Sequence, residues 1–405
     1  MTAITSGEIV FARPSLRDKI TRPLTIFFRS LRHNRAGLIG FIGLVIYAIW
    51  VLIGPIFVPF DSTVRLDELA APLGSRDQLL VRSADASAYT SLASLAGKTV
   101  GIVTKTGNSE TIAAYANTFK VDSTTWSSGN GITKALAKLE NGDIDALVIF
   151  SEQVKANVTG VSDYANLTVS NAQLGKPHLL GTDTQGRDIF SHIINGGTSL
   201  ILTAVLAGFF STIIAVLLGS IAALVGGVVD TLLTAFANFV LTIPAFPLLI
   251  VLAALIQLSN FVVLALLIAA LAWPVLMRAV RSQVLSLRER DYVEAAVALD
   301  LGLPHIVLRE ILPNMMSFIA INFIFAVTSA MYQQVGLVFL GLAPINDYTW
   351  GVMLYFGRTR GTLFSADSAA MVLAPVIAIA MFQVCMVLFA RSLEETFDPR
   401  LRSAR

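Results

Sequence analysis

The residues best placed to do chemistry in this chain form a polar segment at 278–314, and they favour binding of a partner rather than catalysis. Helix-forming residues dominate the first part of the segment. Asp300, Gly302 and Pro304 then interrupt the pattern and predict a turn. A second short amphipathic helix is predicted to end at Pro313, which has no backbone N–H to continue it. The segment is therefore predicted to be a helix, a turn and a helix at a membrane surface.

Five further residues of this segment suit contact with another protein. Glu294 offers a carboxylate to a polar partner, and Ala295 and Ala296 are small enough for close helix packing. Ile311 and Leu312 lie at the end of the second helix. Residue types alone leave open the alternative that the segment is an ordinary polar loop between membrane spans.

Other kinds of chemistry lack the residues they need. Four histidines are scattered without the spacing of a metal motif such as HExxH, and Cys385 is the only cysteine. Gly97, Lys98 and Thr99 resemble the end of a phosphate-binding loop, but Leu92 stands where that loop needs its first glycine. We therefore expect no metal site, no bound cofactor and no ATP site.

The composition indicates that most of the chain lies in lipid. Apolar residues make up 55% of the 405 residues and charged residues 14%, and the mean hydropathy is +0.72. A soluble globular chain has about 25% charged residues. The 29 basic and 27 acidic residues leave a net charge of +2, too small for a nucleic-acid-binding surface. The expected fold class is an α-helical polytopic membrane protein that does not bind nucleic acid.

Six stretches are long and apolar enough to cross a bilayer as helices, since a crossing needs roughly 20 apolar residues. Two of them come from the uncharged run 231–277, divided at Gln257, Ser259 and Asn260. The others are 36–57, 200–224, 315–340 and 369–390. Pro244, Pro247 and Pro274 predict kinks in the third and fourth spans.

The positions of Lys and Arg predict that both ends of the chain are cytoplasmic. Residues 1–35 hold seven basic against two acidic residues, and the tail 391–405 holds four arginines. Basic flanks stay inside, so these segments and 278–314 are assigned to the cytoplasm, whereas the long stretch 61–177 is outside. No signal-peptide cleavage site follows the span 36–57, which is expected to remain as an anchor.

The segment 278–314 resembles the EAA signature of permease subunits of ATP-binding-cassette (ABC) importers, through EAA at 294–296 and ILP at 311–313. In that family the two short helices seat in a groove of the ATP-hydrolysing subunit and transmit its closure to the membrane helices. Asp300 stands where the family has its turn glycine. Aspartate visits the left-handed region more readily than most residues, and Gly302 lies two places on, so the turn is either kept or shifted.

Three more stretches resemble permeases of the dipeptide, oligopeptide and nickel group: SLRHNRAGLIG at 30–40, GTDTQGRD at 181–188 and LEETFDPRL at 393–401. The resemblance implies a type I importer permease with a core at 178–390 in the plasma membrane. It also implies a heterodimer with a second permease subunit, two ATP-hydrolysing subunits and a separate extracytoplasmic solute-binding protein. Members of the group carry peptides, nickel or oligosaccharides, and the sequence leaves the cargo open.

The stretch 181–188 has both a structural and a functional interpretation. Its glycines suit tight turns, and its charged residues suit a cap on the helix that follows. We favour these structural roles over contact with the transported solute. The candidate residues are Gly181, Thr182, Asp183, Gly186, Arg187 and Asp188.

Where the family has a short linker after the first span, this chain has the insert 61–177. Its middle part, about 92–171, alternates predicted strands and helices, which favours a small α/β unit with a largely parallel sheet. The predicted strands are 98–104, 121–126 and 145–150, and the predicted helices are 108–119 and 131–139.

This unit resembles one lobe of an extracytoplasmic solute-binding protein, through SLAGKTVGIVTKTGNSET and ALAKLENGDIDALVIF. In such lobes the turn after the first strand presents backbone donors to an anionic ligand group. The equivalent residues are Thr106, Gly107, Asn108 and Ser109. Binding proteins of that type hold the ligand between two lobes and only one is recognised here, so we favour a docking or scaffold domain over an independent ligand site.

The predicted function is the membrane subunit of an importer that takes its energy from ATP hydrolysis on partner subunits. The spans nearly lack charged residues that could relay protons or sodium. Candidate path-lining residues are Asn238, Gln257, Asn322, Gln333 and Gln334, for each of which hydrogen bonding between helices is at least as good an explanation.

Two other classes of protein are alternatives to an importer subunit. A membrane-anchored solute sensor would use the outer lobe to detect ligand, but no output domain is recognised after the last span. A membrane-embedded enzyme would need an acid pair or a serine–histidine arrangement within the spans, and the sequence has neither. The chain is therefore expected to be a transport subunit and not an enzyme.

Overall fold

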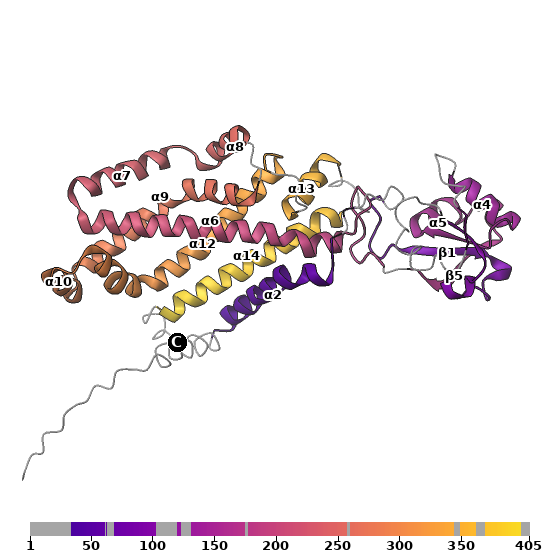
Figure 1. The fold of residues 1–405 in the computed structure, drawn as a ribbon, viewed down its shortest axis with the longest axis horizontal. Coiled ribbons are helices and arrows are strands. Elements are labelled where there is room, and N and C mark those ends of the chain that lie inside the picture. Colours follow the sequence, from indigo (N-terminus) through magenta and orange to yellow (C-terminus); the bar gives the residue numbers. More distant parts are fainter. Residues whose placement is uncertain are drawn as a thin grey trace, which may run out of the picture.

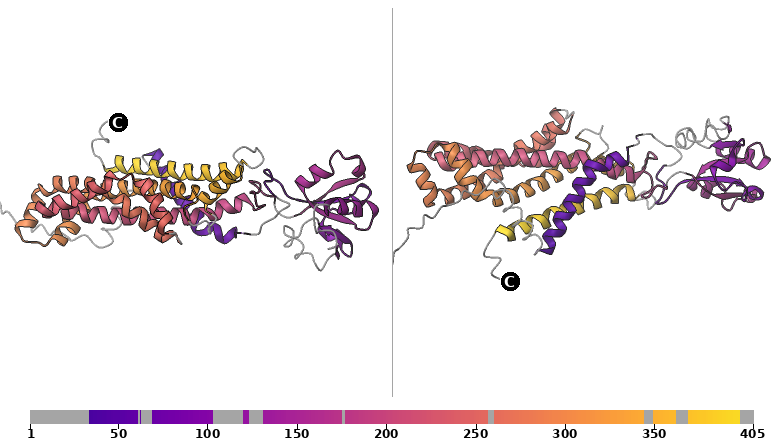
Figure 2. Two further views of the ribbon diagram at one scale, coloured as in Figure 1. Left: turned by 90° about the horizontal axis from the view of Figure 1, so that it is seen from above. Right: turned by 60° about the horizontal axis from the view of Figure 1, so that its bottom comes forward.

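Long uncharged stretches of the sequence fold into helices that lie side by side in a bundle, and the insert folds into a separate α/β unit beyond one end of it (Figure 1). The computed structural model describes residues 34–60, 62, 69–102, 120–122, 131–174, 177–256, 260–343, 349–361 and 369–397. The two parts stay end to end in every view (Figure 2). The bundle helices are α2 (Arg35–Phe57), α6 (Ile189–Val225), α7 (Gly227–Thr242), α8 (Ala245–Ile256), α9 (Phe261–Arg288), α12 (Leu312–Phe339), α13 (Trp350–Thr359) and α14 (Ala370–Phe397).

Five helical stretches in the described residues are long and apolar enough to cross a membrane, and α7 with α8 makes a sixth if this bent pair is one span. The predicted third span is not straight, because α7 and α8 meet at 81°. Pro244 lies at the break and forces the preceding Ile243 into an extended conformation, with φ −90° and ψ 126°. Pro274 lies inside α9, which continues through it, and Pro247 lies in the first turn of α8.

Several helices are longer than the predicted spans. The second was predicted from Leu200, but α6 begins at Ile189 and contains 37 residues, or about 55 Å of helix. It starts earlier because Asp188 caps it, its Oδ2 accepting from the backbone N–H of Ser191 at 2.8 Å. The hydrocarbon core is only about 30 Å thick, so α6 extends beyond it.

The first span is part of the bundle. Glycines recur every third residue on the face of α2 that packs against α14. A Cβ added at Gly40 would lie 2.7 Å from the backbone nitrogen of Phe389, so the helices approach backbone to backbone. The hydroxyl of Tyr47 donates to the carbonyl of Ala378 in α14 at 2.7 Å.

Helix α13 was not predicted, because it is too short for a span. Its first residue, Trp350, is fully buried and donates its indole N–H to the carbonyl of Ile193 in α6 at 2.9 Å. This contact fixes α13 against the end of the bundle that faces the α/β unit (Figure 1).

The α/β unit contains a mixed five-stranded sheet in the order β3-β2-β4-β1-β5. Its strands are β1 (Asp77–Arg82), β2 (Thr99–Ile102), β3 (Lys120–Asp122), β4 (Ala146–Phe150) and β5 (Leu167–Gln173). Strand β2 pairs parallel with β3 and β4, whereas β1 pairs antiparallel with β4 and β5.

The three predicted strands do pair in parallel, as β3-β2-β4, but the prediction of a largely parallel sheet within 92–171 is wrong for the sheet as a whole, which β1 and β5 make mixed. Strand β1 precedes that range. Leu79 and Val81 are fully buried in the apolar cluster on one face of the sheet, and Leu80 is fully buried in the cluster on the other face. Helices α4 (Gly131–Asn141) and α5 (Ser151–Asn157) pack against β4. The predicted helix 108–119 lies outside the described residues.

Candidate functional site

The predicted partner-binding segment lies at the end of the bundle opposite the α/β unit (Figure 1). It consists of α10 (Asp291–Ala298), the single turn α11 (Leu303–His305) and a π-helix at Ile306–Ile311. Val293 and Ala296 of α10 are buried in one apolar cluster with Val280 and Val284 of α9. This packing holds the segment against the C-terminal part of α9.

The turn between α10 and α11 is at Asp300. Asp300 has φ +51°, a left-handed conformation that glycine adopts without strain and aspartate more readily than most residues. Its N–H donates to the carbonyl of Val297 at 2.9 Å, and that of Leu301 donates to Ala296 at 3.1 Å. This pair of bonds is a Schellman motif, which ends a helix. Gly302 has φ −57°, a value open to any residue, so the turn has not shifted to it.

The outer face of α10 presents polar and apolar groups to the surroundings. Glu294 and Ala295 are exposed, and among the described residues the Glu294 carboxylate has no ion-pair partner. Val297 and Leu299 are 56% and 73% exposed. Arg288 borders, with Glu294 and Val297, an open hollow of about 540 Å³. The face combines a carboxylate with unburied apolar side chains, as a protein-binding surface does.

The prediction that Pro313 ends the second helix is wrong. The π-helix runs directly into α12, and the helical stretch is continuous over Leu303–Phe339. A proline within a helix lacks its N–H and crowds the carbonyl four residues earlier, here that of Arg309. The wider π turn before Pro313 accommodates both defects. The contact segment is thus joined to the fifth span without a flexible loop.

The stretch 181–188 forms a closed turn at the other end of the bundle. Thr182 is buried, and its Oγ1 accepts from the N–H of Ala71 at 2.8 Å. Asp183 is also buried, and its Oδ1 accepts from the N–H groups of Gln185 and Arg187 at 2.7 and 2.9 Å. The polar atoms are directed at the chain itself, which favours the structural interpretation of this stretch.

Two glycines and two histidines complete this turn. Gly181 and Gly186 have φ of +76° and +75°, and a Cβ at Gly181 would lie 2.2 Å from the carbonyl oxygen of Ala71. His178 Nδ1 lies 3.1 Å from Asp188 Oδ1. The buried Asp183 Oδ2 lies 3.8 Å from Arg187 Nε and 3.8 Å from His192 Nδ1. The turn therefore ties the base of the insert to the start of α6.

The other candidate residues are less informative. Thr106, Gly107, Asn108 and Ser109 lie outside the described residues, as does Gln257. Asn322 donates to the carbonyl of Phe318 at 2.8 Å and Gln333 to Ser329 Oγ at 3.3 Å, so both are bonded within their own helix. Gln334 is buried, whereas Asn238 is exposed.

One ion pair between helices was not predicted. Arg281 of α9 makes two hydrogen bonds to Asp230 of α7, Nε to Oδ1 and Nη2 to Oδ2, each 2.5 Å. The available signal was that Asp230 is the first charge after the uncharged run 189–229. A lone charge beside a span usually has a partner on a neighbouring helix.

Comparisons with known proteins agree with the permease resemblance. Residues 215–403 match the family "Binding-protein-dependent transport system inner membrane component", and residues 22–72 match the "N-terminal TM domain of oligopeptide transport permease C". Neither match includes residues 73–214, where the α/β unit lies.

Curated relatives cover more than half of the chain. A protein of Brucella suis biovar 1 named as a peptide permease is 34% identical over 58% of this chain and 77% of its own length. The oligopeptide transport system permease protein OppC of Mycobacterium bovis is 30% identical over 57% and 79%. The protein of that name in Haemophilus influenzae is 29% identical over 56% and 71%.

Among solved structures, a crystal structure of ArgBP from T. maritima aligns with a TM-score of 0.22 and 22% identity, over 28% of this chain and 44% of that one. A likeness this low carries no argument about the α/β unit. The two family matches and the identity to the Brucella protein are decisive for the helical part. The chain belongs to the family of inner-membrane components of binding-protein-dependent transport systems, and is a multi-pass permease subunit of an ABC importer whose ATPase activity resides in partner subunits.

Proposed function

We propose that this permease imports peptides or similar small solutes as a heterodimer with a second permease subunit, driven by two ATP-hydrolysing subunits that dock on α10, α11 and the π-helix. The observation that supports docking most directly is the outer face of α10, where Glu294 is exposed without an ion-pair partner in the described chain. Peptide cargo is inferred from the named relatives.

Coupling follows from the rigid connection between this face and the bundle. A partner can shift a conformational equilibrium only if it binds the two states with different free energies. Closure of the ATPase subunits would displace α10 and α11, and the continuous helix Leu303–Phe339 would carry that displacement into the fifth span. Packing of Val293 and Ala296 against α9 would move the fourth span with it.

The insert is proposed to be extracytoplasmic and to dock the separate solute-binding protein. Its position at the end of the bundle opposite α10 supports this orientation, because α10 must be cytoplasmic to meet the ATPase (Figure 1). Basic residues in the N-terminal and C-terminal flanks favour the same orientation. Docking is preferred to an independent ligand site because the unit is a single sheet without a second lobe in the described residues.

The coupling proposal is tested by Glu294→Lys. We expect normal membrane insertion, loss of most uptake and weaker retention of the ATPase subunits, because a lysine repels the group that the carboxylate meets. Uptake in vesicles and co-purification of the ATPases measure the two effects. Glu394→Lys makes the same charge change on the exposed end of α14, away from the docking face, and should leave both near normal. Equal uptake in the two variants would refute the proposal that the ATPase subunits dock on the outer face of α10.

A further inference from the structure

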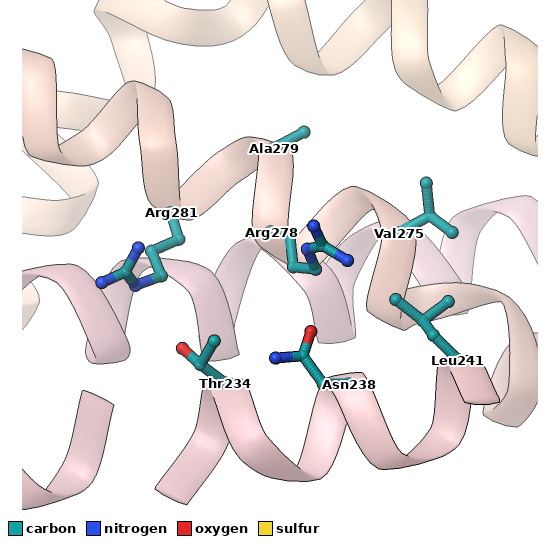
Figure 3. Close-up of a pocket in the computed structure, with 7 residues that line it drawn as sticks. All are labelled: Thr234, Asn238, Leu241, Val275, Arg278, Ala279 and Arg281. Carbon is teal, nitrogen blue, oxygen red and sulfur yellow. The ribbon is translucent and has the colours of Figure 1, made fainter. Parts of the chain in front are cut away.

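The groove between α7 and α9 is a polar site outside the docking face. It has a volume of about 630 Å³ and opens on the side of the bundle. Thr234 and Asn238 point into it from α7, and Arg278 and Arg281 point into it from α9 (Figure 3). Arg278 and Asn238 lie on opposite sides of the groove (Figure 3).

The groove retains an uncompensated positive charge. Arg281 is neutralised by its two hydrogen bonds to Asp230, and the Thr234 hydroxyl donates to the same carboxylate at 3.2 Å. Arg278 is exposed, and no carboxylate in the described ranges lies within ion-pair distance of it. Asp230 therefore neutralises Arg281 but leaves the charge of Arg278 unpaired, and an anionic group is the complement that the groove lacks.

Arg278 lies where a membrane helix meets the headgroups. The uncharged residues of α9 from Phe261 to Met277 rise about 26 Å as a helix, close to the hydrocarbon thickness of about 30 Å. Asp230 is likewise the first charge after the uncharged run that contains α6. With α10 cytoplasmic, as the proposed function requires, this edge of the spans is the cytoplasmic one. Arginine at such a depth extends its charge toward phosphates while its stem stays in apolar surroundings.

The rim of the groove suits acyl chains. Val275 of α9 and Leu241 of α7 line it, and Val275 is 66% exposed. A carboxylate of a protein partner would have to leave water to reach this apolar rim, which is costly. A lipid brings its own acyl chains to the rim and its phosphate to the cation.

We propose that this groove binds the phosphate of an anionic lipid of the cytoplasmic leaflet. Arg278 pairs with the phosphate, the Asn238 amide bonds to a further headgroup oxygen, and the acyl chains lie along Val275 and Leu241. The Asp230–Arg281 pair holds α7 against α9 and so keeps the groove open.

The test uses the purified full chain, with its partner subunits, in detergent to which phosphatidylglycerol or zwitterionic phosphatidylcholine is added. Native mass spectrometry measures the affinity of the first retained lipid. Arg278→Gln is expected to weaken phosphatidylglycerol binding about fivefold, the effect of one arginine near a charged headgroup, and leave phosphatidylcholine unchanged. Arg278→Lys, which keeps the charge, is expected to stay within about twofold of the unmodified protein.

Arg391→Gln is the matched control. It removes an exposed arginine at the cytoplasmic end of α14, remote from the groove, and should leave the first phosphatidylglycerol in place. Equal losses in the Arg278→Gln and Arg391→Gln proteins would overturn the site. Displacement of the lipid by inorganic phosphate at equal concentration would also overturn it, since the acyl chains would then contribute nothing.

A photoreactive residue in place of Asn238 identifies the occupant in membranes. Adducts with phospholipid support the proposal, and adducts with the second permease subunit overturn it. Neither measurement requires ATP or uptake. Failure of the lipid site is thereby separated from failure of the coupling proposal, which Glu294→Lys tests.

Discussion

At the scale of single residues, Asp300 and Gly181 both take left-handed backbone conformations, but for different reasons. Asp300 ends α10 in open surroundings, with the Schellman hydrogen bonds closed around it. Gly181 has a carbonyl oxygen of the insert where its side chain would be. The first position therefore requires only a tolerant backbone, whereas the second requires the absence of a Cβ.

Asp300→Gly is expected to raise the free energy of unfolding by about 0.5–1 kcal/mol, because glycine adopts φ +51° without the steric penalty of a Cβ. Asp300→Val should lower it by more than about 1 kcal/mol, since β-branched residues avoid this region. Thermal unfolding of the purified protein measures both changes. Similar melting temperatures for the two variants would show that the turn is not formed at residue 300.

Gly181→Ala is expected to lower the free energy of unfolding by about 2–4 kcal/mol, because it combines backbone strain with a steric clash against the carbonyl oxygen of Ala71. Gly97→Ala is the matched control: Gly97 has the same φ of +76° with nothing within 4 Å of an added Cβ, so it should cost only about 1 kcal/mol. The difference between their melting temperatures isolates the contact at Ala71. A difference near zero would mean that the base of the insert is not held at this point.

At the residue scale, the sequence predicted the role of a side chain only where a recognised motif contained it. The segment 294–313 was identified by its EAA and ILP motifs, and Asp300 was identified because it replaces the glycine of that pattern. The partner of Thr182 is Ala71, 111 residues away in the chain, and no local pattern encodes such a bond. Distant contacts of this kind depend on how whole elements meet.

At the scale of elements, hydropathy located the spans but not their directions. Uncharged runs predicted the helices that became α2, α9 and α14, because length and apolarity suffice for a crossing. Pro244 predicted a kink where α7 and α8 meet, and the helices do change direction there, but neither hydropathy nor the proline predicts the size of the bend, 81°. Pro313 was read as a helix end, although a π turn allows a helix to pass through it.

Pro313→Ala tests the role of that π turn. With the N–H restored, we expect the π turn to revert to α-helix, which would rotate α10 and α11 relative to α12 by roughly one residue, or about 100°. Insertion should be normal, whereas uptake and ATPase retention should fall severalfold. Pro375→Ala, inside α14, removes a proline far from the docking face and should leave uptake near normal. Normal uptake in both variants would show that coupling does not depend on the π turn.

At the scale of the whole molecule, the insert is joined to the bundle by two connecting segments that lie side by side. The N–H of Gly74 donates to the carbonyl of His178, and the N–H of His178 donates to Ser75, each at 2.8 Å. The chain thus leaves and returns at one place, as inserted domains commonly do. The order of the five strands could not be predicted, because β1 pairs with β4 and β5 across long separations in sequence.

Deletion of residues 76–176, with a two-residue turn joining Ser75 to Pro177, is expected to leave the bundle folded, because the ends to be joined are already hydrogen-bonded neighbours. The deletion should retain the ATPase subunits but lose most of the uptake that the solute-binding protein stimulates. Transport assays with and without added binding protein measure this loss. Undiminished stimulation would contradict the docking role of the insert.

The pairing of α2 with α14 has a consequence for biogenesis. The two helices are the first and the last of the described bundle to be synthesised, yet the glycine face of α2 is complementary to the backbone of α14. After α2 enters the bilayer, its glycine face therefore remains in contact with lipid until α14, the last of these helices, has been inserted. Closure of the bundle is the final step of its assembly, and a substitution such as Gly40→Leu would block that step after otherwise normal insertion.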